Sequence, residues 1–121
     1  MRILMIEDNE SNAYLARFLL ERAGHVVELA RTGARGVASA QLGGFDAILL
    51  DLRLPDGNGC DFVAELRAAD PRPIPVIAVS AHAMPADQQR ALDVGCAAFI
   101  EKPIQVASFV ATIEQIANRA R

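Results

Sequence analysis

The chain has 121 residues, a length that fits one domain near the commonest domain size. Its apolar content of 52% is enough to build a hydrophobic core and excludes a disordered chain. The net charge of −3 argues against a direct nucleic-acid partner, because binding to nucleic acid needs a basic face.

The sequence carries no sign of a membrane or secreted protein. Acidic residues follow Ile6 too early for the apolar core of a signal peptide, and no apolar run approaches the roughly 20 residues of a membrane span. Cys60 and Cys96 lie far apart without metal-ligand spacing, which is typical of buried thiols in a reducing compartment. We therefore expect a cytoplasmic protein with no membrane partner.

Five apolar, strand-like runs alternate with five helix-like segments along the chain. The predicted elements are strand 2–6, helix 10–23, strand 25–29, a helix from 33 to the glycines at 43–44, strand 46–51, helix 58–68, strand 74–79, helix 85–94, strand 97–100 and a last helix with an apolar stripe at Val106, Phe109, Val110, Ile113, Ile116 and Ala117. Polar residues on strand 25–29 indicate an edge position.

This alternation predicts an α/β fold. Strands that alternate with helices of this length form βαβ units with right-handed crossovers. The result is a doubly wound, five-stranded parallel sheet with helices on both faces. We see no linker and no internal repeat, so we expect one domain over residues 1–121 and no output domain.

Asp51 stands at the most informative position in the chain. It ends an apolar run of the kind that forms a strand buried on both faces, and a cluster of turn residues follows it. Open α/β sheets bind their ligands at the carboxyl ends of such strands. The simpler interpretation is an aspartate that only ends a strand and caps a turn.

Polar residues stand at three other strand ends as well. They are the pair Glu7-Asp8 after the first strand, Ser80 after the fourth and Lys102 after the fifth. Because the carboxyl ends of parallel strands share one edge of the sheet, we expect these side chains to meet Asp51 there. Four such positions in one chain favour a functional site over four unrelated surface residues.

The chemistry of this set points to phosphoryl transfer. Three crowded carboxylates repel one another unless a cation is present, and Mg²⁺ takes carboxylates together with water and phosphate oxygens. Lys102 supplies a compact positive charge and Ser80 a hydroxyl donor for a phosphoryl oxygen. Asp51 can attack phosphorus to give an acyl phosphate. Phosphoryl transfer needs mainly positioning and charge neutralisation, which these residues supply.

Together, these motifs resemble the signature of response-regulator receiver domains of two-component signalling, over essentially the whole chain. The residues that carry the resemblance are Glu7-Asp8, Asp51, Ser80-Ala81 and Lys102-Pro103. The resemblance implies a flavodoxin-like (βα)5 fold with strand order 2-1-3-4-5. It also implies that Asp51 accepts a phosphoryl group from a histidine kinase or a histidine phosphotransfer protein.

The resemblance implies roles for the other residues of the site. Asp8, Asp51 and the backbone carbonyl of Arg53 would bind Mg²⁺, with Glu7 acting through water. Ser80 and Lys102 would bind the phosphoryl oxygens. Pro103 disfavours a helical residue before it, and a cis bond at this proline would aim Lys102 at the site.

Further positions are assigned by the same resemblance. Phe99, three residues before Lys102, matches a switch aromatic that responds to the hydroxyl residue and moves inward on phosphorylation; an ordinary core phenylalanine is the alternative. His82 and Arg53 match the variable rim of the site, where they could tune the access of water to the acyl phosphate.

We therefore expect a stand-alone phosphoacceptor switch that catalyses at most its own phosphorylation and dephosphorylation. Its output face would consist of the fourth helix, the fifth strand and the last helix, and its output would be a downstream protein or onward phosphotransfer. A monomer and a phosphorylation-dependent dimer both stay open. So does excision of the chain from a larger hybrid kinase.

Three alternatives compete with this assignment. A phosphatase of the haloacid-dehalogenase type needs a second aspartate two residues after the nucleophile, where this chain has Arg53. A flavodoxin-like cofactor carrier needs a phosphate loop after the first strand, where Glu7-Asp8 would repel a phosphate. A degenerate receiver that binds proteins without phosphorylation would not need the complete set of acidic pair, acceptor, hydroxyl and lysine.

Overall fold

The computed structural model describes residues 1–81 and 84–119, which form thirteen short elements. In chain order these are β1 (Arg2–Ile6), α1 (Glu10–Arg22), β2 (Val26–Ala30), α2 (Gly33–Gln41), β3 (Ala47–Asp51), β4 (Arg53–Leu54), β5 (Gly57–Asn58), the 3-10 helix η1 (Gly59–Phe62), α3 (Val63–Ala68), β6 (Val76–Ser80), α4 (Pro85–Asp93), β7 (Ala98–Glu101) and α5 (Phe109–Arg119).

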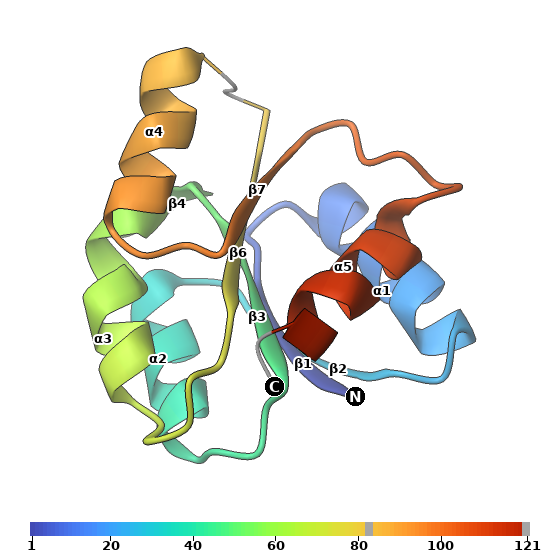
Figure 1. The fold of residues 1–121 in the computed structure, drawn as a ribbon, viewed down its shortest axis with the longest axis horizontal. Helices are drawn as coiled ribbons and strands as arrows, with labels where there is room; N and C mark the ends of the chain where they lie inside the picture. The colour runs from blue at the N-terminus through green and yellow to red at the C-terminus, as the bar shows by residue number, and fades with distance from the viewer. Residues whose placement is uncertain (82–83, 120–121) are drawn as a thin grey trace.

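Five strands form one parallel sheet in the order β2-β1-β3-β6-β7. Counting only these five strands, this is the predicted order 2-1-3-4-5, with β2 at an edge as expected. Helices α1 and α5 cover one face of the sheet, and α2, α3 and α4 cover the other (Figure 1). The predicted α/β fold class is confirmed.

The sheet separates two hydrophobic cores. All five residues of β3 and all five of β6 are buried, as their continuous apolar sequence predicts for central parallel strands. Alternate strand residues point to opposite faces, so Leu50 and Ala78 pack toward α2, α3 and α4, whereas Leu49 and Ile77 pack toward α1 and α5.

Side chains and glycines set the helix ends where the sequence places them. The Asn9 carboxamide accepts a hydrogen bond from the Asn12 amide at 3.0 Å, and the Thr32 hydroxyl accepts one from the Arg35 amide at 3.1 Å. These are the N-caps of α1 and α2. Gly24, with φ of 94°, ends the α1 segment, a conformation that side chains disfavour.

Two details of the predicted helices are wrong. The last helix begins only at Phe109, and Val106 lies in the preceding turn with 59% of its surface exposed. The predicted helix 58–68 is divided into the 3-10 helix η1 and the six-residue helix α3. Apolar spacing shows which face a helix buries, but the first hydrogen-bonded turn decides where the helix starts.

The segment after Asp51 forms a small hairpin that the sequence analysis does not predict. Strands β4 and β5 pair antiparallel, with Arg53 opposite Asn58 and Leu54 opposite Gly57. The turn between them contains Pro55 and Asp56, residue types that favour tight turns. Two-residue strands carry too little apolar pattern to be recognised.

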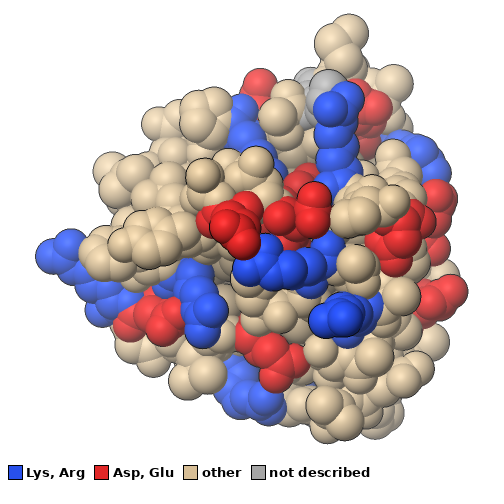
Figure 2. Space-filling view, turned by 180° about the vertical axis from the view of Figure 1, so that it is seen from behind, with Lys and Arg blue, Asp and Glu red and all other residues tan. Residues whose placement is uncertain are grey.

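The cysteines, the lengths of the helices and the surface charges complete the description of the fold. Cys60 and Cys96 are both free and buried, as expected for thiols that act as small core residues. None of the described helices is long and apolar enough to span a bilayer. On the face in Figure 2, basic and acidic side chains are interspersed.

Candidate functional site

The predicted polar residues meet at one edge of the sheet. Asp51 is the last residue of β3 and Ser80 the last of β6, the strand beside it. Glu7 directly follows β1, on the other side of β3, and Lys102 directly follows β7. Parallel register therefore brings residues from four separate parts of the chain to the carboxyl end of the sheet.

Lys102 links the two buried carboxylates of this edge. Its ammonium nitrogen lies 2.6 Å from Oε1 of Glu7 and 3.3 Å from Oδ2 of Asp51. All three side chains are largely removed from water, with 12%, 7% and 10% of the side-chain surface of Lys102, Glu7 and Asp51 exposed. Ion pairs this deeply buried are screened little by salt, and the loss of one partner would leave the other charge buried without compensation.

Burial at this edge, next to Asp51, raises the pKa of Glu7 to about 7. Burial is the main cause, and the hydrogen bond and negative charge of Asp51 add to it. Lys102 acts in the opposite direction, because a nearby cation favours the ionised carboxylate. The effect of Lys102 on the pKa of Glu7 is therefore smaller than the combined effect of burial and Asp51.

The backbone after Asp51 is folded closely around it. The Arg53 amide donates a hydrogen bond to Oδ1 of Asp51 at 3.0 Å, and the Gly59 amide donates one to the Leu52 carbonyl at 2.9 Å. A Cβ on Gly59 would lie 2.4 Å from the Asp51 carbonyl oxygen, so only glycine fits there. Sequence reasoning missed this role of Gly59, although its place in the turn cluster after Asp51 was visible.

Ser80 and Lys102 are held side by side by the backbone. The Lys102 amide donates to the Ser80 carbonyl at 2.9 Å, and Ser80 is only 1% exposed. The Lys102–Pro103 peptide bond is cis, one of the two isomers that the sequence left open. The serine and the lysine thus sit on adjacent strand ends, on the side of Asp51 away from β1.

Asp8 lies outside this buried group, exposed at the start of the β1–α1 connection. Among residues 1–81 and 84–119, no three His, Cys, Asp or Glu side chains are grouped so that they could hold a metal ion. The predicted Mg²⁺ ligands comprise only two carboxylates, Asp8 and Asp51, and the Arg53 carbonyl. All are the oxygen donors that Mg²⁺ prefers.

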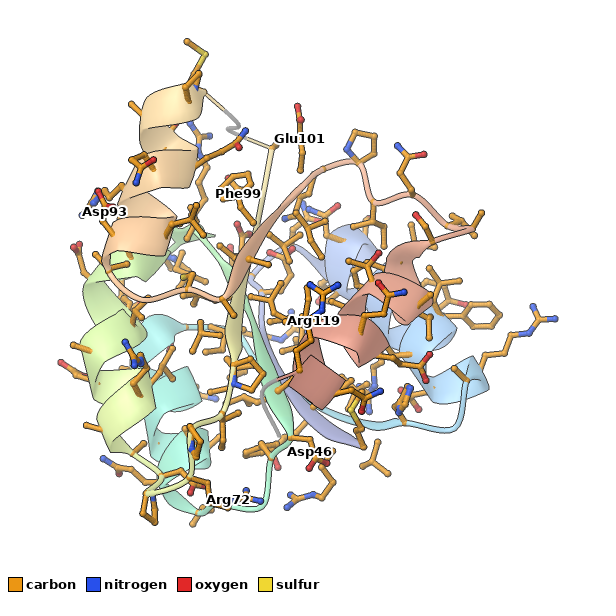
Figure 3. All side chains as sticks on the ribbon, in the orientation of Figure 1. Asp46, Arg72, Asp93, Phe99, Glu101 and Arg119 are labelled. Atoms are coloured by element: carbon orange, nitrogen blue, oxygen red, sulfur yellow. The ribbon has the colours of Figure 1, made fainter. Side chains whose placement is uncertain are left out.

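The structure describes two of the three predicted switch and rim residues, Phe99 and Arg53. Phe99, on β7, is half-buried and packs against the core on the α4 side (Figure 3). Arg53 is exposed two residues after Asp51. His82, the other predicted rim residue, lies outside the described residues.

An apolar pocket opens beside the carboxylates. It lies between α1 and the segment after β7, and Glu7, Asp51 and Lys102 form its polar wall. Leu15 of α1 and Ile104 are among its apolar lining residues. A group that approaches Asp51 from this side would therefore meet an apolar surface.

The family model for the response regulator receiver domain matches residues 3–114. The chain belongs to this family. Members of the family work in two-component signalling as switches that interact with histidine kinases and downstream targets, rather than as classical enzymes.

Several individual proteins resemble this receiver domain over nearly its whole length. The polar-differentiation response regulator DivK of Brucella anthropi is 40% identical over 113 residues, which cover 93% of this chain and 92% of the relative. The receiver domain of the sensor histidine kinase PA1611 from Pseudomonas aeruginosa is 32% identical, with a TM-score of 0.88 and 97% of each chain covered. A CheY-like receiver domain protein from Methanospirillum hungatei is 26% identical, with a TM-score of 0.90, and 98% and 94% covered.

Proposed function

We propose that this receiver domain is a phosphorylation-dependent switch in which Asp51 accepts a phosphoryl group from a phosphohistidine of a kinase or phosphotransfer protein. The observation that carries the proposal is the position of Asp51 at the end of a fully buried strand, 3.3 Å from the ammonium of Lys102. When a phosphoryl group is attached to this carboxylate, the neighbouring ammonium can stabilise the negative charge of the new group.

The reaction at Asp51 needs one bond to form and one to break. The oxygen Oδ2 or Oδ1 of Asp51 attacks phosphorus and forms a P–O bond, while the P–N bond to the donor imidazole breaks and its electron pair returns to the nitrogen. Lys102 and the Ser80 hydroxyl would bind oxygens of the transferred group. Their fixed positions on adjacent strand ends lower the cost of organising these contacts.

The donor set fits Mg²⁺. We assign Asp8, Asp51 and the Arg53 carbonyl as its ligands, with Glu7 acting through water. When bound, the ion neutralises charge on the carboxylates and the phosphoryl oxygens. The geometry supports this assignment, because the carboxylates of Glu7 and Asp51 share the single ammonium of Lys102 at this edge. The receiver domain of PA1611 has a magnesium ion coordinated in its active site cleft.

Phosphorylation would act on the face formed by α4, β7 and α5. Movement of Ser80 toward the phosphoryl group would open space for Phe99, a β7 residue whose side chain lies on the α4 side of the sheet (Figure 3). A downstream protein that binds one arrangement of this face better than the other would read the switch. We place this exchange in the cytoplasm, with a kinase or phosphotransfer protein as donor.

Intact mass after incubation with acetyl phosphate tests the proposal. Wild-type protein with Mg²⁺ should gain the mass of one phosphoryl group, and protein without Mg²⁺ should gain far less. Asp51→Asn should gain none, because an amide oxygen does not form the acyl phosphate. A mass gain in Asp51→Asn equal to that of the wild type would contradict the assignment of Asp51.

A second measurement covers a receiver that accepts only from a protein donor. Beryllium fluoride mimics the phosphoryl group, and its titration should shift amide resonances around Asp51 and on the α4-β7-α5 face. If neither acetyl phosphate nor beryllium fluoride changes the wild-type protein, the chain is a degenerate receiver that binds partners without phosphorylation.

A further inference from the structure

The hairpin that follows Asp51 is fastened at its tip to helix α2. Asp56, in the turn between β4 and β5, accepts the Gly33 amide through Oδ1 at 2.9 Å and the Ala34 amide through Oδ2 at 3.0 Å. Both amides belong to the first turn of α2, where they have no partner within the helix. One carboxylate therefore holds two donors of a helix that lies more than twenty residues earlier in the chain.

A second contact holds η1, the segment directly after the hairpin, against the same end of α2. A Cβ on Gly33 would lie 2.3 Å from an atom of the Phe62 ring, which belongs to η1 and directly follows the hairpin. The absence of a side chain at Gly33 lets this ring cover the start of α2. The amide of Gly33 is thus bound by the hairpin turn while its Cα is covered by the ring.

The other end of the hairpin reaches the phosphoacceptor. The Arg53 amide bonds to Oδ1 of Asp51 at 3.0 Å, and Arg53 pairs with Asn58 across the hairpin. From these contacts we infer that Asp56 is a positioning residue: by fastening the hairpin to α2 it fixes the backbone of Arg53 against Asp51. This inference rests on the proposed function insofar as the Arg53 carbonyl is a Mg²⁺ ligand.

Asp56 does more than cap a helix, because it also joins the hairpin to α2. Thr32 already caps α2 by accepting the Arg35 amide, a hydrogen bond that stays within the α2 segment. The two backbone amides hold the pKa of Asp56 below its usual range, so the carboxylate is ionised at neutral pH. Asp56 therefore joins two elements, whereas Thr32 acts on one.

Three variants separate these roles. Asp56→Ala removes the fastening, and Thr32→Ala removes the other cap at the same helix end. Asp61→Ala removes a carboxylate of η1 that pairs with Arg90 on α4 at 2.8 Å, and so controls for the loss of one negative charge near the site. All three are compared with the wild type below their unfolding temperatures.

The first readout is hydrogen exchange at the Arg53 amide, which needs neither Mg²⁺ nor phosphorylation. Exchange should be several-fold faster in Asp56→Ala than in the wild type and unchanged in Thr32→Ala and Asp61→Ala. Equal exchange in Asp56→Ala and the wild type would overturn the inference. Equal acceleration in Thr32→Ala would reduce Asp56 to a helix cap and overturn it as well.

The second readout is the Mg²⁺ affinity measured by titration. Asp56→Ala should weaken it on the order of tenfold, as is typical for residues that orient a ligand, while the two controls stay near the wild type. A loss in Asp61→Ala equal to that in Asp56→Ala would assign the effect to charge and overturn positioning. If wild-type protein binds no Mg²⁺, the proposed metal site fails, and the Arg53 exchange rate still decides the role of Asp56.

Discussion

Lys102 and Glu7, 95 residues apart in the chain, form the shortest ion pair of the site, with 2.6 Å between Nζ and Oε1. The distance from the same ammonium to Asp51 is longer, at 3.3 Å. The protein therefore holds the Lys102 ammonium between two carboxylates instead of against Asp51 alone. In the proposed reaction, a phosphoryl group on Asp51 would draw this ammonium toward its own oxygens.

Replacing Lys102 should uncouple the switch from the metal site. In Lys102→Met, Mg²⁺ should still bind, since its assigned ligands are untouched, but the amide shifts that beryllium fluoride causes in α4, β7 and α5 should be largely lost. Arg119→Met removes an exposed cation from α5 and is the control (Figure 3). Normal shifts in Lys102→Met would refute the role of this lysine.

Asp8 should matter for the metal and little for the fold. Asp8→Ala should weaken Mg²⁺ binding by more than about tenfold, because a carboxylate ligand is lost. Since Asp8 is exposed, the substitution should change the free energy of unfolding of the protein by less than about 0.5 kcal/mol. Glu10→Ala, an exposed carboxylate on α1 that pairs with Arg31 at 3.5 Å, should leave the Mg²⁺ titration unchanged. Equal titrations for Asp8→Ala and the wild type would count against the site.

The buried face of α5 should carry much of its contribution to stability. Ile113 is fully buried, so Ile113→Ala should lower the free energy of unfolding by about 2–5 kcal/mol through lost burial and a new cavity. Leu42→Ala, at a position 84% exposed, should change it by no more than about 0.5 kcal/mol. Urea denaturation checks both, and similar midpoints would show that α5 is only loosely docked.

Asp70 should make stability depend on acid pH. Hydrogen bonds from the Arg72 side chain and amide hold the pKa of Asp70 below its usual value, and Arg72 also bonds to the Phe45 carbonyl at 2.9 Å. A carboxyl with a lowered folded pKa stabilises the protein above its unfolded pKa, and this contribution is lost as the pH falls through the folded pKa.

Asp70→Asn therefore should be less stable than the wild type at about pH 7, and the difference should shrink below about pH 3. Urea midpoints at the two pH values measure it. Asp93→Asn removes an exposed carboxylate from the end of α4 and serves as a control (Figure 3). An equal gap between Asp70→Asn and the wild type at both pH values would exclude the ionised pair as its cause.

The sequence predicts the sheet and the site for one physical reason. Buried parallel strands are nearly continuous apolar runs, so each strand and its carboxyl end can be located from hydrophobicity alone. Once the strands are parallel, residues such as Asp51 and Ser80 must share an edge. The parallel arrangement of the strands therefore predicts that Lys102 lies near Asp51, although the two residues are far apart in the sequence.

Other features depend on contacts that sequence spacing does not contain. The deep burial of Glu7 and its pairing with Lys102 follow from how two distant strand ends pack, and the sequence suggested only a water-mediated role. Asp56 holds the β4–β5 hairpin against the start of α2. No periodicity in the sequence relates these two segments. Val106 matches the apolar stripe of α5 but precedes its first turn.

The sheet also acts as a partition. Apolar side chains from α1 and α5 pack in one compartment and those from α2, α3 and α4 in another, with the strands between them. Substitutions in opposite compartments share few neighbours, so their effects on stability should add. The proposed output face of α4, β7 and α5 draws on both compartments, because α5 packs beside α1 and α4 lies across the sheet. A change of packing on either side of the partition can therefore reach that face.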